Sequence, residues 1–298
     1  MLLAEKRAAR RSPPVQVKPI EAPDVERVAE FLHAHLNARV TKDAWVNAMR
    51  QSWCAESPNR GYMLLDGEAV VGAHLAFYSE RELDDKTAEP ICNLGAWCVL
   101  PEHRFHSLRL LRALLGQEGY TFTDLSPSGN VIPLNSRLGF DTLDTNTRLV
   151  PNLPWPGRAR GAMISADPEI IERTLTGRDL RLYHDHADAD AARHLVLIRD
   201  GRWGYVIFRK DRRKGLPLFA SILYVSDREL LREMARPLAR HLLIHHGALV
   251  TLAESRITGH LPLPSFPLRS PRTKMFRSAR LPAAQVDYLY SELVCVPW

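Results

Sequence analysis

One succession of elements occurs twice in this chain, and it constrains the fold more than any other feature. The stretch "RGYMLLDGEAVVGAHLAFYSE" predicts two strands joined at Asp66-Gly67, and "HLVLIRDGRWGYVIFRK" predicts two strands joined at Asp200-Gly201. Asp-Gly between two apolar runs is a strong signal of a β-hairpin. After each hairpin the pattern predicts an apolar strand, then a helix, then another strand. We therefore expect two tandem copies of one structural unit.

Apolar spacing and turn residues predict the individual elements of both units. The order is not the regular alternation of a doubly wound fold, so we predict an α/β class with a mixed (α+β) sheet in each unit. In the first half we expect strands at 15–20, 91–100, 120–127 and 144–150, and helices at 22–37, 41–53 (capped by Thr41), 101–119 and 130–140. In the second half we expect strands at 216–225 and 248–254, a helix at 226–247, and a tail that packs back on the body.

Composition shifts suggest the unit boundaries. A basic segment at 1–14 has no sustained apolar core, so we expect a disordered leader. A Pro/Gly-rich passage indicates a linker at 151–164, which leaves units at 15–150 and 165–298.

Bulk properties exclude several classes of protein. No apolar run reaches the roughly 18 residues that a membrane span requires, so we expect no membrane partner. The four cysteines, Cys54, Cys92, Cys98 and Cys295, show no CxxC spacing, which favours reduced thiols in a cytoplasmic protein without a metal site. A net charge of +6 suits an anionic partner. The charge is too dispersed to indicate nucleic acid.

The stretch "WCVLPEHRFHSLRLLRALLG" (97–116) carries an unusual helix start. Arg104, His106, Arg109 and Arg112 lie where a first turn usually carries acids, and no acidic residue occurs from His103 to Gln117. Cations at the positive end of a helix dipole repel it unless an anion lies between them. The pattern therefore predicts an anion site, with a solvated basic face as the alternative.

Two motifs carry a family resemblance. "VLPEHR" at the end of an apolar strand, followed by "GNVIPLNSRLGF", resembles the GNAT superfamily of acyl-CoA-dependent N-acyltransferases over residues 15–150. The second half resembles the same fold more faintly, by element order alone. The resemblance implies that acetyl-CoA or another acyl-CoA is the co-substrate, with its pyrophosphate held by backbone N–H groups of the loop. The family's two loop glycines fall at Ser107 and Arg109.

The resemblance also implies a set of site residues. Direct acyl transfer to an amine would use a backbone N–H of the strand at Ala96 to Val99 to polarise the thioester carbonyl. The family's usual tyrosine acid falls on Asn135, whose amide cannot deliver a proton, so Tyr120, Cys98 or water would act instead. Glu102 and His103 are candidate bases, and each is equally compatible with a surface loop. The implied acyl-CoA contacts are Cys98, Val99, Arg104, Phe105, His106, Ser107, Leu108, Arg109 and Asn130.

The second unit shows a different helix start. Ser226 and Glu229 fit a capping box, and the acids there would repel a phosphate, so we expect this copy to be degenerate and structural. The segment 183–194 has ligand-type residues (His184, His186, Asp188, Asp190 and His194) but is better explained as a polar loop than as a metal site. The basic segment 209–215 is expected to be a solvated loop, with contact to an acidic acceptor or RNA as the alternative.

Three functions remain open from the sequence. The first is an acyl-CoA-dependent N-acyltransferase, most simply an acetyltransferase, acting on an amine of a small molecule or a polymer. The second is a binding or scaffold protein on the same fold without catalysis. The third is a tandem transferase whose donor is aminoacyl-tRNA, although no basic patch with interleaved aromatics supports this. Whether the chain forms a homodimer is also open.

Overall fold

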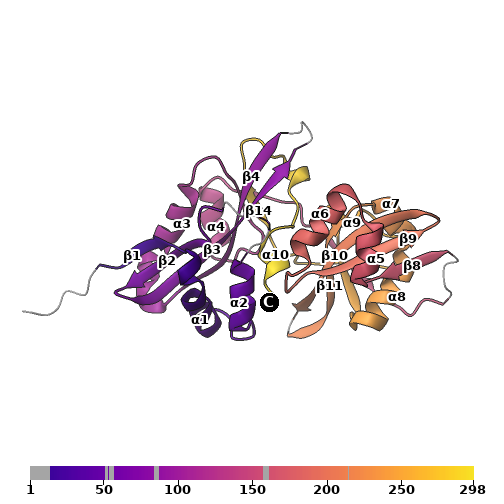
Figure 1. Cartoon of the computed structure of the whole chain (residues 1–298), viewed down its shortest axis with the longest axis horizontal. Helices are drawn as coiled ribbons and strands as arrows, with labels where there is room; N and C mark the ends of the chain where they lie inside the picture. The colour runs from indigo at the N-terminus through magenta and orange to yellow at the C-terminus, as the bar shows by residue number, and fades with distance from the viewer. Residues whose placement is uncertain (1–13, 51–52, 54–56, 84–86, 157–160, 214) are drawn as a thin grey trace, which may run out of the picture.

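The computed structural model describes residues 14–298 except 51–52, 54–56, 84–86, 157–160 and 214. The described chain forms two seven-stranded mixed sheets that lie side by side, each with its own helices (Figure 1). This confirms the predicted α/β class with two tandem units. Apart from Pro14, the predicted leader at 1–14 lies outside the described residues, as does Cys54.

The first sheet has the order β1-β2-β3-β4-β5-β14-β6, and the second has the order β8-β9-β10-β11-β12-β7-β13. The first sheet consists of β1 Gln16–Pro19, β2 Gly61–Asp66, β3 Ala69–Glu82, β4 Ala88–Val99, β5 Thr121–Asp124, β14 Met275–Arg277 and β6 Asp141–Thr142. The second consists of β8 Ala162–Ser165, β9 Arg193–Arg199, β10 Arg202–Arg213, β11 Leu216–Val225, β12 Val250–Glu254, β7 Thr147–Pro151 and β13 Phe266–Pro267.

Helices cover both sheets. In the first half these are η2 Ala22–Asp24, α1 Val25–His35, α2 Lys42–Met49, η3 Pro101–His106, α3 Ser107–Leu115 and α4 Val131–Arg137. In the second half they are α5 Pro168–Thr174, α6 Gly177–His186, α7 Arg228–Glu233, α8 Ala235–His246, α9 Ser255–Thr258, η4 Ala283–Gln285 and α10 Glu292–Cys295.

The two sheets have the same topology except that they exchange one strand. β7 comes from the end of the predicted first unit, yet it pairs with β12 and β13 in the second sheet. β14 comes from the C-terminal part of the chain, yet it pairs with β5 and β6 in the first sheet. The strand expected at 144–150 therefore exists, but it completes the other sheet. The unit boundary proposed at residue 150 falls inside this exchanged strand.

Local sequence signals account for most of the elements. Both Asp-Gly hairpins form, as β2–β3 and β9–β10, and the Thr41 hydroxyl accepts a hydrogen bond from the Ala44 N–H at 3.2 Å. The capping box expected at Ser226 is wrong. Asp227 caps α7 instead by accepting from the Leu230 N–H at 2.8 Å, because the Ser226 hydroxyl accepts from the Tyr205 N–H.

The basic segment at 209–215 is not a solvated loop as far as it is described. β10 and β11 remain paired out to Arg213 and Leu216, and Arg209 and Asp211 are buried in this pairing. The alternating side chains of β10 therefore turn toward the interior of the molecule at this end of the sheet.

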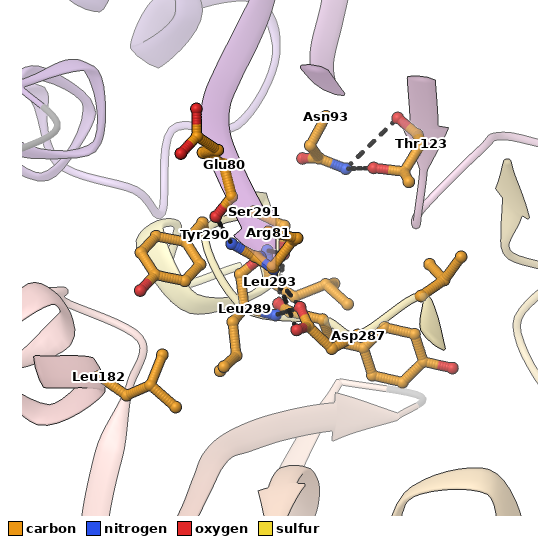
Figure 2. A network of polar contacts seen from close by, with 12 residues as sticks. Glu80, Arg81, Asn93, Thr123, Leu182, Asp287, Leu289, Tyr290, Ser291 and Leu293 are labelled. Atoms are coloured by element: carbon orange, nitrogen blue, oxygen red, sulfur yellow. Dashed lines mark hydrogen bonds and ion pairs between the residues drawn. The ribbon is translucent and has the colours of Figure 1, made fainter. Parts of the chain in front are cut away.

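The C-terminal segment returns to the first unit, as expected, and joins the two halves. The buried Arg81 guanidinium on β3 forms an ion pair with Asp287 at 3.0 Å and donates to the Leu289 carbonyl at 2.9 Å (Figure 2). Its guanidinium carbon also lies 4.1 Å from the centre of the Tyr290 ring. These contacts hold the segment that leads into α10 against the first sheet. Among the described residues, no helix is long and apolar enough to cross a membrane.

Candidate functional site

Strands β4 and β5 separate partway along the first sheet. They pair in parallel from Ile91–Thr121 to Leu94–Asp124, whereas β4 continues to Val99. At the point of separation β4 contains a bulge, because its register with β3 shifts between Ala73–Cys98 and Leu75–Gly95. Ala96 lies in this bulge with a φ of 50°, an unusual conformation for a residue with a side chain. In the described chain no strand pairs with β4 beyond Leu94 on the β5 side, so backbone groups remain for a ligand.

A cavity of about 540 Å³ lies where the two strands separate. Its walls come from β3, β4, the segment between β5 and α4, and the returning C-terminal segment. The lining residues are Leu36, His74, Leu94, Gly95, Ala96, Trp97, Asp124, Ser126, Pro127, Ser128, Val131, Arg272, Thr273, Leu293 and Trp298. The exchange of β14 is therefore what brings Arg272 and Thr273 to the cavity of the first unit.

Asp124 is the buried carboxylate of this cavity. Burial raises its pKa to about 6, although bonds from Asn135 and from the Ser126 backbone oppose the shift. The Asn135 side-chain Nδ2 donates to Asp124 Oδ2 at 2.8 Å, and Asn135 itself has no exposed surface. A carboxylate with this pKa is largely ionised at neutral pH and can accept a proton. The sequence motifs point to Asn135 but not to Asp124.

A second buried carboxyl group lies behind the cavity wall. Ser126 Oγ donates to Glu292 Oε1 at 2.7 Å, and the Glu292 backbone N–H donates to Asn93 Oδ1 at 3.2 Å. Asn93 in turn donates to Thr123 on β5 (Figure 2). Burial raises the pKa of Glu292 to about 8, and the nearby Asp124 charge adds to the shift. Glu292 is therefore protonated at neutral pH beside an ionised Asp124.

The third titratable group of the cavity is His74. It is fully buried and stacks on Trp97 with ring centres 4.7 Å apart. Burial lowers its pKa to about 3, so the imidazole is neutral across the physiological range. Asp124 is consequently the cavity group whose pKa suits proton transfer near neutral pH.

The loop after β4 is wound more tightly than the resemblance implies. Residues 101–106 form the 3₁₀ helix η3, which runs directly into α3. The His103 N–H donates to the Leu100 carbonyl and the Ser107 N–H to the Arg104 carbonyl, so part of the backbone donors are used internally. The helical run thus begins at Pro101 and carries Glu102 in its first turn.

The side chains of this loop are mostly exposed. Arg104 has no ion pair with any described residue, and Phe105 exposes 77% of its surface. Arg109 donates to the Val15 carbonyl at 2.7 Å, so it faces β1. The pKa of His106 is lowered by desolvation and by the nearby Arg109 and His103. Ser107 is half-buried and Leu108 is exposed.

The remaining predicted residues lie at several places in the first unit. Cys98 and Val99 pair with β3, and burial raises the pKa of the Cys98 thiol. Glu102 is exposed on η3, and His103 Nε2 lies 3.8 Å from Asp66. The structure brings neither of them to the cavity lining. Tyr120 precedes β5, at the opposite end from Asp124, and Asn130 is exposed at the start of α4.

The matching helix start in the second unit is already occupied. Arg202 pairs with the capping residue Asp227 and with Glu233, each at 3.0 Å. Arg228 Nε donates to the Ile257 carbonyl at 2.9 Å, which ties α7 to α9 directly after β12. Protein groups therefore fill the region where an anion would approach this helix.

The segment at 183–194 is the end of α6 followed by the turn into β9. His186 Nδ1 lies 2.8 Å from the Leu182 carbonyl and its Nε2 accepts from the Tyr290 N–H, while His194 Nδ1 lies 2.7 Å from the Tyr205 hydroxyl. Burial lowers the pKa of both imidazoles to about 4, so they are packed as neutral groups. In the described part of the chain, no three His, Cys, Asp or Glu side chains are grouped so that they could hold a metal ion.

This chain resembles known proteins in structure but not in sequence. No family model matches the sequence, and no curated protein matches it significantly. A GCN5-related N-acetyltransferase from Anabaena variabilis is similar with a TM-score of 0.56 and 12% identity, over 88% of this chain and 72% of that one. A putative acetyltransferase from Pyrococcus horikoshii is similar with a TM-score of 0.54 and 12% identity, over 95% and 92%.

An N-myristoyltransferase from Saccharomyces cerevisiae with bound myristoyl-CoA is similar with a TM-score of 0.52 and 11% identity. It is matched over 89% of this chain and 79% of its own. This chain has the GNAT fold, present as two tandem units. Because these likenesses span both halves, they confirm the fold expected from "VLPEHR" and "NSRLGF" and extend it to the second half.

Proposed function

We propose that this protein is an acyl-CoA-dependent N-acyltransferase whose single working site is the cavity between β4 and β5. The observation that carries this proposal is Asp124, a buried carboxylate with a pKa of about 6 in that cavity. The GNAT fold and the myristoyl-CoA bound by a similar structure support an acyl-CoA donor. Acetyl-CoA is the simplest donor, and the acceptor is an amine.

In the proposed reaction Asp124 is the catalytic base. It takes the proton of the acceptor amine as the nitrogen attacks the thioester carbonyl carbon. The new carbon–nitrogen bond replaces the carbon–sulfur bond, and coenzyme A leaves as a thiolate that then takes up a proton. Asn135 is a positioning residue, because its amide fixes the carboxylate and favours its charged form.

Unpaired backbone on β4 would stabilise the transition state. β4 has no partner on the β5 side between Gly95 and Val99 in the described chain, so N–H groups there are available to the developing oxyanion. The Ala96 bulge sets the direction of these groups. This role agrees with the one that the resemblance implies for Ala96 to Val99.

The coenzyme A moiety would be held by the loop at 101–109 and its neighbours. Because η3 uses part of its own N–H groups, we assign more of the phosphate contact to side chains. Arg104 is an exposed loop cation without an ion pair among the described residues, whereas Arg109 already donates to the Val15 carbonyl, and His106 and Ser107 lie beside Arg104. The proposed contact set remains Cys98, Val99, Arg104, Phe105, His106, Ser107, Leu108, Arg109 and Asn130.

The second unit would serve as structure and as a wall of the acceptor site. Arg202, Asp227 and Arg228 fill its helix start, which supports the absence of acyl-CoA binding there. The segment after its last paired strands contributes Arg272, Thr273 and Leu293 to the working cavity.

Binding and turnover test the proposal together. Acetyl-CoA and longer acyl-CoAs should raise the melting temperature, because a ligand that binds only the folded state stabilises it. Thiol release across a panel of amines should follow, and Asp124→Asn should reduce turnover by about two to four orders of magnitude while acyl-CoA still binds. Full turnover in Asp124→Asn would rule out this base.

A non-catalytic binding protein on the same fold is the second candidate. The tight winding of η3 and the bond from Arg109 to Val15 favour it, since both reduce the donors that could face a pyrophosphate. Stabilisation by acyl-CoA without thiol release from any amine would support this candidate. Stabilisation by aminoacyl-tRNA alone would support a tRNA-dependent donor.

A further inference from the structure

A small polar cavity lies between the two halves, next to the proposed active site. It has a volume of about 60 Å³ and is lined by four cationic and two acidic side chains, among other residues. The cations are Arg209, Arg213, Arg272 and Lys274, and the acids are Asp211 and Glu254. The cluster therefore carries an excess of positive charge inside the molecule.

Two of the cations already have acidic partners. Lys274 Nζ lies 2.5 Å from Glu254 Oε2, and Arg272 Nη2 lies 3.5 Å from Asp211 Oδ1. The Ser221 hydroxyl donates to the other oxygen of Asp211 at 3.0 Å. The two acids are thus occupied, and Arg209 and Arg213 make no ion pair with any residue that the structure describes.

Arg209 is the unusual member of the cluster. It exposes only 2% of its surface and donates from Nη1 to the Leu293 carbonyl at 3.0 Å. Its Nε and Nη2, and Nε of Arg213, are buried without an acceptor among the described residues. Leaving a buried charged donor unpaired is costly, so such groups usually have a partner. Burial lowers the pKa of Arg209 and of Arg213 and the nearby Arg272 charge adds to this, whereas the Asp211 charge opposes it.

The small cavity shares part of its wall with the large one. Arg272 and Leu293 line both cavities. Leu125 lines the small cavity, whereas its chain neighbours Asp124 and Ser126 line the large one. A group bound in the small cavity would therefore lie beside the wall that it shares with the cavity of the proposed catalytic base.

We propose that Arg209 and Arg213 form an anion subsite that takes the carboxylate of the acyl acceptor, so that the acceptor is an amine bearing a small acidic group. This rests on the proposed function for the position of the amine. A water molecule needs roughly 10–15 Å³, so the cavity holds a group of a few atoms, which suits a carboxylate. Both arginines line this cavity and have buried N–H groups without an acceptor among the described residues, and such donors suit the two oxygens of a carboxylate.

Matched acceptors test the subsite. The acceptors are linear ω-amino acids of increasing chain length, each compared with its own amide in acyl transfer. The wild type should prefer at least one acid over its amide by about 10- to 100-fold in kcat/KM, mainly through KM. Arg209→Gln and Arg213→Gln should each bring that ratio close to one. Arg212→Gln is the matched control, because Arg212 is the exposed neighbour on β10.

The outcomes separate the subsite from the proposed function. Equal rates for every acid and amide pair in the wild type, or a preference that survives in both variants, would overturn the subsite. If no amine is acylated at all, the proposed function fails while the subsite is still measured directly. Sodium acetate, compared with the same concentration of the bulkier sodium gluconate, should then raise the melting temperature of the wild type and of Arg212→Gln. It should not raise that of Arg213→Gln. No acetate effect on the wild type would overturn the subsite. Among the described residues Arg213 makes no hydrogen bond to α10, so this variant does not depend on the Arg209 contact with Leu293.

Discussion

The Asn135 side chain donates a hydrogen bond to Asp124 at 2.8 Å inside the first unit, and Asn135 has no exposed surface. Asn135 comes from α4 and Asp124 from the end of β5, so the bond fixes the two elements that border the cavity. The position that the resemblance assigns to a tyrosine acid is thus held by an amide that orients a carboxylate. An ionised carboxylate held in this way can accept a proton, whereas the Asn135 amide cannot supply one.

The first prediction concerns the pH dependence of turnover. Asp124 must be ionised to accept a proton, so kcat/KM should rise with pH through an apparent pKa near 6. Asn135→Ala removes a hydrogen bond that favours the charged form of Asp124, so it should raise this apparent pKa by about one unit. Ser136→Ala, at an exposed position of α4, should leave this apparent pKa unchanged. An unchanged profile in Asn135→Ala would remove Asn135 as a positioning residue.

The second prediction concerns affinity for the donor. Arg104 is an exposed loop cation without an ion pair among the described residues, so a phosphate contact would be its main electrostatic interaction. Arg104→Ala should weaken acyl-CoA binding by roughly 5- to 10-fold in Kd, less than for a buried contact because solvent screens the charge. Arg112→Ala, exposed further along α3, should change the Kd by less than about twofold. Equal Kd values for wild type and Arg104→Ala in calorimetry would contradict the proposed phosphate site.

Local patterns predicted the elements that local forces decide. The two Asp-Gly hairpins, the Thr41 cap and the basic α3 follow from turn chemistry and periodicity, and all are present. The exchange of β7 and β14 could not be predicted in this way, because the pairing of a strand depends on sheets that form far apart in the sequence. The short helices α5 and α6 lie in a polar stretch, and their packing against the second unit comes from tertiary structure.

The site was predictable only in part, for the same reason. "VLPEHR" and "NSRLGF" located the strand, the loop and Asn135. Asp124 is the last residue of the ordinary strand β5, and it lines a cavity with Arg272, Leu293 and other residues that return from the C-terminal segment. The basic segment at 209–215 is predicted as a solvated loop, but the pairing of β10 with β11 buries Arg209. Long-range burial, which changes the chemistry of a charged residue, leaves no mark in its neighbouring sequence.

The third prediction concerns stability and pH. Glu292 holds its proton in the folded state up to a pKa of about 8, whereas its ordinary pKa is 4.5. Between these values the unfolded chain binds fewer protons, so the free energy of unfolding should fall as pH rises. The buried histidines His74, His186 and His194 have lowered pKa values, so they act in the opposite direction, and their contribution ends about one unit above the ordinary histidine pKa of 6.5.

The difference between the wild type and Glu292→Gln isolates Glu292, because the histidines contribute equally to both. From pH 6.5 to 8, urea unfolding should show a loss of about 2 kcal/mol for the wild type relative to Glu292→Gln. Glu292→Gln keeps the size of the side chain and can still accept from Ser126. Glu118→Gln, at an exposed position, should follow the wild type. Parallel pH profiles for the wild type and Glu292→Gln would show that another group sets the pH dependence.

The fourth prediction concerns the cooperativity of the two units. Met275 on β14 has no exposed surface and packs in the first unit against Phe122 and Phe140, although it belongs to the C-terminal part of the chain. Met275→Ala should lower the free energy of unfolding by about 2–5 kcal/mol. Because β7 and β14 cross between the sheets, neither sheet is complete without the other half of the chain.

Both units should therefore melt in one calorimetric transition, and Met275→Ala should lower the temperature of that single transition. Met163→Ala, 43% exposed on β8, is the matched control and should shift stability by less than about 0.5 kcal/mol. Two separate transitions, of which Met275→Ala moves only one, would show that the exchanged strands do not couple the units.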